Sequence, residues 1–194
     1  MRILILGPQG SGKGTQAKRI ESEYGMPHVA TGDILREAVA AGTPLGRIAK
    51  PIYDRGELVP DDVIIGVIRD RLARPDAEQG FVLDGFPRNL AQAEALDDML
   101  AEIDRPLDVV LELRIPRDVA IERMLKRAEE EGRSDDTPEA IERRLALYAE
   151  VTQPVVDHYA PTGSLVAIHG DGTIDAVWAE IQDVLERADG RARR

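Results

Sequence analysis

A glycine-rich segment near the start of the chain constrains its fold more than any other feature. Residues 7–15 read Gly-Pro-Gln-Gly-Ser-Gly-Lys-Gly-Thr, and they separate the apolar run 3–6 from a stretch of helical character over about 12–24. This is the G-x-x-x-x-G-K pattern in the strand-to-helix setting that a phosphate-binding loop (P-loop) requires. Glycines let backbone N–H groups wrap an anion, and the start of the helix adds partial positive charge. The segment therefore predicts a nucleoside triphosphate site.

The lysine of this loop supplies a full positive charge for the outer phosphates. Gly14 follows Lys13 where the general pattern has Ser or Thr, so the hydroxyl that usually binds magnesium is displaced to Thr15. The triphosphate is expected to contact the whole second half of the loop: Gly10, Ser11, Gly12, Lys13, Gly14 and Thr15.

Short apolar runs alternate with longer amphipathic stretches along the rest of the chain. Five strands are predicted, at 3–6, 28–30, 81–83, 109–113 and 165–168. Helices are predicted at 12–24, from about 31, at 44–56, 60–74, 89–103, 116–131, 137–159 and 174–188. Such alternation is typical of an α/β fold: here a P-loop NTPase-type, doubly wound, five-stranded parallel sheet flanked by helices. Ligands bind beyond the carboxyl ends of the strands in such sheets.

Composition narrows the class of protein. The 194 residues suit one domain, and 36 acidic against 25 basic residues give a net charge of −11, which argues against nucleic acid or an anionic membrane as partner. The chain has no cysteine, which excludes a thiolate zinc site and a cysteine nucleophile. We find no signal-peptide pattern and no apolar run of about 20 residues, so a cytoplasmic protein is expected. We also expect a monomer.

Several side chains outside the loop are candidates for metal binding, catalysis or core packing. Asp84 ends the third predicted strand, which suits a carboxylate that holds Mg²⁺ directly or through water. The three histidines, His28, His158 and His169, show no metal-ligand spacing, and we interpret them as strand or helix-face residues without a catalytic role. Trp178 is expected to pack in the core beneath the last helix.

A triphosphate site alone does not name a reaction. The Asn-Lys-x-Asp element that reads guanine is impossible, because the one asparagine, Asn89, precedes Leu90. A nucleotide-binding regulator or an ATPase switch that phosphorylates no second substrate is compatible with the loop by itself.

Further motifs give a resemblance to a known family. Thr-Gly-Asp-Ile-Leu-Arg stands at 31–36, Gly-Glu-Leu-Val-Pro-Asp at 56–61 and Leu-Asp-Gly-Phe-Pro-Arg at 83–88. Gln92, Arg123, Arg127, the segment 132–136 and Arg144 follow in order. With residues 7–16, this series resembles the adenylate kinase family of nucleoside monophosphate kinases along nearly the whole chain. The resemblance implies reversible transfer of the terminal phosphoryl group of Mg-ATP to AMP, giving two ADP.

The resemblance also implies roles for individual residues. Those of the reaction centre would be Lys13, Arg88, Arg123, Arg127, Arg133 and Arg144. Arg123 and Arg127 would serve the ATP side, and the backbone of Gly172 would approach the adenine of ATP. The AMP side would comprise Thr31, Arg36, Glu57, Leu58, Val59, Gly85, Phe86, Pro87, Arg88, Gln92, Arg133 and Arg144. Thr31 and Gln92 would select adenine. Asn89 also occurs in pyrimidine-type relatives, so a pyrimidine nucleotide kinase is the nearest alternative.

Two moving parts are implied as well. The core would comprise 1–29, 60–125 and 135–194, with a monophosphate-binding insert at 30–59 and a short lid at 126–134. Only five residues separate Arg127 from Arg133, and without cysteines the chain resembles the short-lid type, which has no zinc. Asp135 and Asp136 are expected to pair with lid arginines on closing, which would keep water from the transferred phosphate.

Overall fold

The computed structural model describes residues 1–132 and 136–192, and its centre is a parallel sheet. Its strands are β1 (Arg2–Leu6), β2 (His28–Ala30), β3 (Phe81–Asp84), β4 (Val109–Arg114) and β5 (Leu165–His169), in the order β2-β3-β1-β4-β5. Leu4 of β1 lies opposite Leu83 of β3 and Val110 of β4. The five-stranded, all-parallel sheet confirms the predicted fold class.

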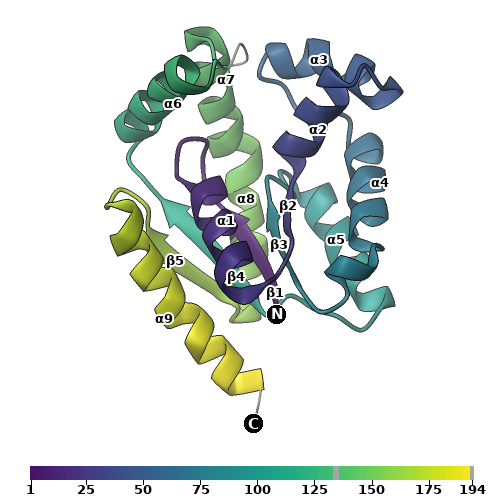
Figure 1. The fold of residues 1–194 in the computed structure, drawn as a ribbon, viewed down its shortest axis with the longest axis vertical. Coiled ribbons are helices and arrows are strands. Elements are labelled where there is room, and N and C mark those ends of the chain that lie inside the picture. The colour runs from purple at the N-terminus through teal and green to yellow at the C-terminus, as the bar shows by residue number, and fades with distance from the viewer. Residues whose placement is uncertain (133–135, 193–194) are drawn as a thin grey trace.

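Helices cover both faces of this sheet (Figure 1). They are α1 (Lys13–Tyr24), α2 (Thr31–Ala40), α3 (Pro44–Asp54), α4 (Asp61–Leu72), α5 (Leu90–Glu102), α6 (Arg117–Glu131), α7 (Pro138–Leu147), α8 (Gln153–Tyr159) and α9 (Ile174–Ala192). Single 3₁₀ turns lie at Pro75–Ala77 and Ala160–Thr162. No helix in the two described stretches combines the length and apolar character needed to cross a bilayer.

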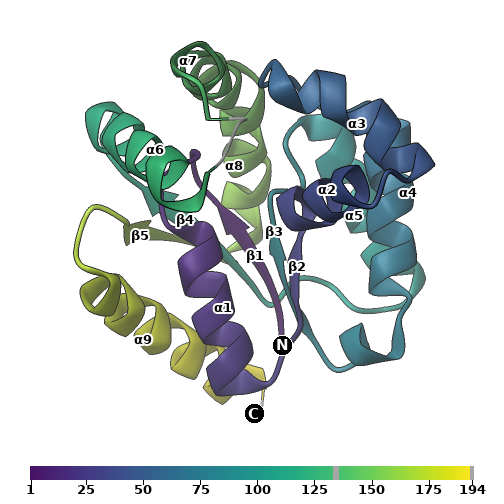
Figure 2. The same cartoon turned by 45° about the horizontal axis from the view of Figure 1, so that its top comes forward.

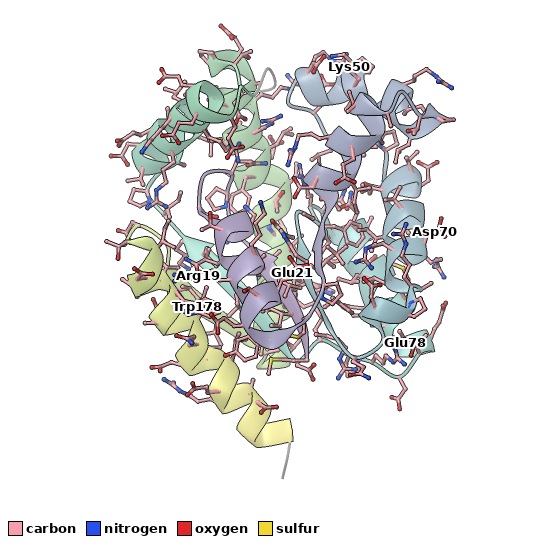
Figure 3. All side chains as sticks on the ribbon, viewed as in Figure 1. Arg19, Glu21, Lys50, Asp70, Glu78 and Trp178 are labelled. Carbon is pink, nitrogen blue, oxygen red and sulfur yellow. The ribbon has the colours of Figure 1, made fainter. Side chains whose placement is uncertain are left out.

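Side-chain alternation along the strands divides the core into two layers. Ile3 and Ile5 of β1 pack with α1 and α9, whereas Leu4 and Leu6 face the layer formed with α4, α5 and α8. Trp178 of α9 is buried in the first layer, as predicted. The guanidinium of Arg19 on α1 lies 5.3 Å from the centre of its ring, a cation–π contact that ties the two helices together (Figure 3).

The strand order reverses at β1, and this point positions the site. β2 and β3 lie on one side of β1, with β4 and β5 on the other. Above the carboxyl ends of the strands, α2 and α3 stand on one side and α6 and α7 on the other (Figure 2). Open parallel sheets bind their ligands at such a reversal.

The predicted continuous helix over 137–159 is wrong in one respect. A π-helical turn, Tyr148–Thr152, separates α7 from α8, and the N–H of Gln153 donates to the carbonyl of Tyr148 across five residues. Pro154 explains the break, because it has no N–H for the carbonyl of Glu150 and its ring would clash with that carbonyl in a continuous α-helix.

Smaller differences concern helix ends. The residue types Thr and Asp at 31, 33, 171 and 173 favour helix caps at these positions, but Ala30 is the N-cap of α2 and Thr31 is already helical. Thr173 caps α9 by accepting from the N–H of Ala176 at 3.2 Å. α9 continues to Ala192, four residues beyond its predicted end.

Candidate active site

A cavity of about 620 Å³ opens at the carboxyl ends of the strands. It is within the size range of small-ligand sites. Sequence-predicted residues from every region of the chain line it: Gly10, Ser11, Gly12, Lys13, Gly14, Thr15, Arg36, Asp84, Gly85, Pro87, Arg88, Arg123, Arg127, Arg144 and Gly172. Residues that lie more than 150 positions apart in the sequence thus line one cavity.

The charge of this cavity is opposite to that of the chain as a whole. Its lining includes eight lysines and arginines: Lys13, Lys18, Arg36, Arg88, Arg123, Lys126, Arg127 and Arg144. Four carboxylates accompany them: Asp33, Asp84, Glu130 and Glu131. Among the described residues, the cavity lining therefore has four more positive than negative groups, in a chain of net charge −11. Such a concentration of like charge favours a polyanionic ligand.

The P-loop has the backbone geometry that its glycines predict. Gly10 has a φ of +83°, and a Cβ there would lie 2.6 Å from the carbonyl oxygen of Ala120, so only glycine fits between the loop and α6. α1 begins at Lys13, and its N-terminal N–H groups face the cavity. Lys13 Nζ donates to the carbonyl oxygens of Gly7 and Pro8, both at 2.8 Å.

Burial changes the proton affinity of this lysine. Desolvation lowers the pKa of Lys13 to about 8; the carboxylate of Asp84 opposes the shift, and the charges of Arg88 and Arg127 reinforce it. A bound polyphosphate would stabilise the ammonium and raise this pKa again. Ligand binding and protonation of Lys13 are therefore coupled.

A pH dependence follows from that coupling. We expect kcat/KM for ATP to be constant below the free-enzyme pKa of about 8 and to fall about tenfold per pH unit above it, because the free lysine then loses its proton. kcat reports the complex, in which the pKa is raised, so it should stay level to higher pH. Steady-state rates from pH 6.5 to 10 test this. The variant Lys13→Arg, which stays charged, should show no such fall; an equal fall in both proteins would contradict the assignment.

Asp84 stands at the end of β3 with a histidine beside it. His28 Nε2 lies 3.3 Å from Asp84 Oδ2, and the histidine side chain is 6% exposed. Burial raises the pKa of Asp84, but the His28 hydrogen bond and the charges of Lys13 and Arg88 outweigh it, so the net pKa is below the ordinary value. Sequence reasoning placed His28 on a strand but missed this contact. The sequence held no signal for it, because the contact depends on the parallel pairing of β2 with β3, which brings Ala30 opposite Asp84.

Arg88 is held by three hydrogen bonds in the irregular segment between β3 and α5. Its N–H donates to Gln92 Oε1 at 2.7 Å, and its carbonyl accepts from Thr152 Oγ1 at 2.8 Å. Its Nε donates to the carbonyl of Gly85 at 2.7 Å. Two of these bonds hold the backbone of Arg88, and the third holds its guanidinium at the cavity wall.

Four further arginines of the cavity bond to carboxylates or carbonyls. The fully buried carboxylate of Asp136 accepts from Arg127 Nη2 and from Arg144 Nη1, both at 2.6 Å. Arg36 pairs with Asp33. Arg123 Nη1 donates to the carbonyl of Gly170 at 2.7 Å, beside the predicted adenine contact at Gly172. Of the predicted lid arginines, Arg127 pairs with Asp136, whereas Arg133 and Asp135 lie outside the described residues.

Six residues predicted for the AMP side do not line the cavity: Thr31, Glu57, Leu58, Val59, Phe86 and Gln92. Phe86 and Val59 belong to the hydrophobic core. Thr31 is buried, and its hydroxyl donates to the carbonyl of Asp84 at 3.3 Å. Glu57 pairs with Arg55 and Arg143.

The side-chain amide of Gln92 forms hydrogen bonds with other residues of the protein. Besides accepting from Arg88, it donates from Nε2 to Asp61 Oδ1 at 2.6 Å, and Asn89 Nδ2 donates to the same oxygen at 2.9 Å. Gln92 is buried, with one N–H and one lone pair remaining beyond these bonds. Its adenine-reading role stays a prediction, while its contact with Arg88 is a structural fact that the sequence did not suggest.

The carboxylates of the cavity suit one kind of metal site. Within residues 1–132 and 136–192, no cluster of three or more His, Asp or Glu side chains could cage a metal ion. Mg²⁺ needs no such cage, since it binds through one or two carboxylates together with substrate phosphates and water. Asp84, ionised and facing the P-loop across Gly14, fits that requirement.

Comparison with known proteins identifies the family. A profile described as adenylate kinase matches residues 5–164. The adenylate kinase of Stenotrophomonas maltophilia strain K279a is 50% identical over 181 residues, covering 93% of this chain and 97% of that protein. The adenylate kinase of Xanthomonas euvesicatoria pv. vesicatoria strain 85-10 is 47% identical over 187 residues, covering 96% of this chain and all of that protein. With its P-loop, its cationic cavity and these relatives, the chain belongs to the adenylate kinase family of nucleoside monophosphate kinases, which are phosphotransferases.

Proposed function

We propose that the protein transfers the terminal phosphoryl group of Mg-ATP to AMP, reversibly, and forms two molecules of ADP. The observation that carries the proposal is the cavity with four excess positive charges, in which arginines from both sides of the P-loop converge. Two nucleotides bring more negative charge into one site than an ATPase needs to accommodate. The family and its named relatives support the same reaction.

The two substrates would occupy opposite halves of this cavity. Lys13 and the backbone of the P-loop bind the phosphates of ATP, with Arg123 and Arg127 beside them. Arg36 and Arg88 bind the phosphate of AMP. Arg144, whose guanidinium is oriented by Asp136, contacts the group in transit, and Arg133 is assigned the same task.

The reaction needs alignment and charge stabilisation more than covalent help from the protein. An oxygen of the AMP phosphate attacks the terminal phosphorus of ATP, the bond to the bridging oxygen breaks, and ADP leaves. The arginines and Lys13 neutralise the charge on the transferred group. Asp84 would hold Mg²⁺ through water, and that ion, when bound, neutralises the outer phosphates of ATP and fixes their orientation.

Water must be excluded, or the enzyme would hydrolyse ATP. We propose that the insert 30–59 closes over AMP and that the lid 126–134 closes over ATP. The insert already contacts α7: Glu57 Oε1 lies 3.2 Å from Arg143 Nη2. Closure would bring Thr31, Gln92 and the backbone of 57–59 to the adenine. The enzyme is proposed to act as a monomer.

A comparison of phosphoryl acceptors tests this function. With Mg-ATP as donor, we expect the highest kcat/KM with AMP, at least tenfold above CMP, UMP and GMP, and slow ATP hydrolysis when no acceptor is present. Coupled detection of ADP measures all five rates. Faster turnover with CMP or UMP would identify a pyrimidine nucleotide kinase. ATP hydrolysis that AMP does not change would identify an ATPase switch.

A further inference from the structure

The backbone of Arg88 has no support from regular secondary structure. It lies in the segment between β3 and α5, outside any helix or strand, so its N–H and carbonyl need partners from elsewhere. Two buried side chains supply them: Gln92 accepts from the N–H at 2.7 Å, and Thr152 donates to the carbonyl at 2.8 Å. Bonds on both sides of one Cα restrict its φ and ψ, and hence the direction in which the arginine points.

The two partners come from different parts of the fold. Gln92 is the third residue of α5 and lies only four positions after Arg88, so its bond to Arg88 is a local one. Thr152 ends the π-helical turn, 64 residues away, in the same helical arm that carries Arg144 on α7. The Thr152 bond is therefore the one that ties the loop of Arg88 to the arm of Arg144.

The π-helical turn accounts for how one arm presents both residues. An α-helix advances 100° per residue, so residues four apart rotate by about 40°, and residue 152 would stand about 80° away from residue 144. In the structure Arg144, Tyr148 and Thr152 all line the same cavity. The wider π turn offsets part of that rotation and keeps the three side chains on one face.

We propose that Thr152 is a positioning residue for the acceptor side, presented by the π-helical turn to fix Arg88 relative to Arg144. The proposal rests on the role of Arg88 in the function proposed above. Thr152 acts through the backbone of Arg88, so its loss should weaken the handling of AMP while ATP binding stays intact.

Two substitutions at Thr152 distinguish the effect of losing its hydroxyl donor from the effect of changing the shape of its side chain. Thr152→Val keeps the branched side chain and removes the donor, leaving a buried carbonyl without its partner, whereas Thr152→Ser keeps the donor. We expect Thr152→Val to raise KM for AMP about tenfold and to lower kcat several-fold, with KM for ATP within twofold of wild type. Thr152→Ser should restore near wild-type values.

A matched control lies at the other end of α8. Thr162 Oγ1 donates to the carbonyl of Tyr159 at 2.7 Å, a bond of the same kind outside the cavity. Thr162→Val should leave both KM values unchanged. Melting temperatures of all the variants check that they are folded.

A double-mutant cycle gives the decisive measurement. If Thr152 acts through Arg88, Thr152→Val should cost about tenfold in kcat/KM for AMP in the wild-type background and less than twofold in the Arg88→Ala background. An undiminished effect in the second background, an equal rise in KM for ATP, or no effect of Thr152→Val at all would each overturn the proposal. A wild-type protein that cannot phosphorylate AMP would overturn the proposed function and this inference together; an active one with Thr152→Val unchanged overturns this inference alone.

Discussion

Replacing Arg88 with alanine is expected to lower kcat/KM for AMP about a thousandfold. The guanidinium donates from Nε to the carbonyl of Gly85, and Gln92 and Thr152 hold the backbone N–H and carbonyl of the same residue, so little reorganisation is needed as charge develops on the transferred group. Removing one preorganised donor of this kind typically costs 10²–10³-fold, or about 3–4 kcal/mol. The measurement is steady-state kinetics with AMP varied at saturating Mg-ATP.

An arginine outside the cavity provides the control for this substitution. Arg69 on α4 pairs with Glu102 at 3.4 Å, and both side chains are more than half exposed. Exposed pairs contribute about 0–1 kcal/mol, so Arg69→Ala should leave the kinetics unchanged. Arg88→Lys keeps the charge but loses the planar fork, and it should restore only part of the rate. An Arg88→Ala enzyme within threefold of wild type would remove Arg88 from the reaction.

The second large effect concerns stability, at Asp136. Its carboxylate is fully buried and accepts from Arg127 and Arg144 at 2.6 Å, so Asp136→Asn would leave two arginines facing an amide without charge. Removing one partner of a buried ion pair costs about 3–5 kcal/mol. For a chain of this size each kcal/mol lowers Tm by about 2–4 °C, so a fall of about 10 °C is expected in a thermal unfolding scan.

An exposed aspartate paired with a single arginine is the control for Asp136. Asp76 accepts from both guanidinium nitrogens of Arg71, at 3.0 and 2.8 Å, but its side chain is 53% exposed. Asp76→Asn should lower Tm by no more than about 2 °C, because water already screens that pair. Equal shifts for the two variants would show that burial of Asp136 contributes nothing.

Local sequence patterns predicted the scaffold well, for a physical reason. An apolar run ended by glycine and followed by Gly-x-Gly-Lys has one common solution, a buried strand, an anion-binding turn and a helix, because each step depends on neighbouring residues only. The strands were accordingly predicted to within a few positions, and the sheet was predicted to be parallel. The site residues beyond the P-loop and Asp84 came instead from the resemblance to a family, and six of them do not line the cavity. Helix ends were less certain: Ala30 caps α2, and α9 continues past its expected end.

The π-helical turn shows where local pattern reasoning fails. Periodicity over 137–159 is helical throughout, and it does not distinguish a continuous helix from two helices with one wider turn between them. Pro154 was the available signal, since its missing N–H and its ring disfavour a continuous α-helix at this point. What the break achieves, the presentation of Thr152 beside Arg88, depends on contacts 64 residues apart in sequence.

By itself, then, the sequence determined a nucleotide-binding α/β fold with a P-loop at the carboxyl end of β1. It also identified, through its resemblance to a family, the arginines that line the cavity. Only the tertiary structure decided how those groups are held: Asp136 between Arg127 and Arg144, His28 against Asp84, and Gln92 and Thr152 on either side of Arg88. The division is physical. Turns, strands and helices are encoded by residues a few positions apart, whereas the orientation and proton affinity of a charged group depend on burial and on partners that meet only when the chain has folded.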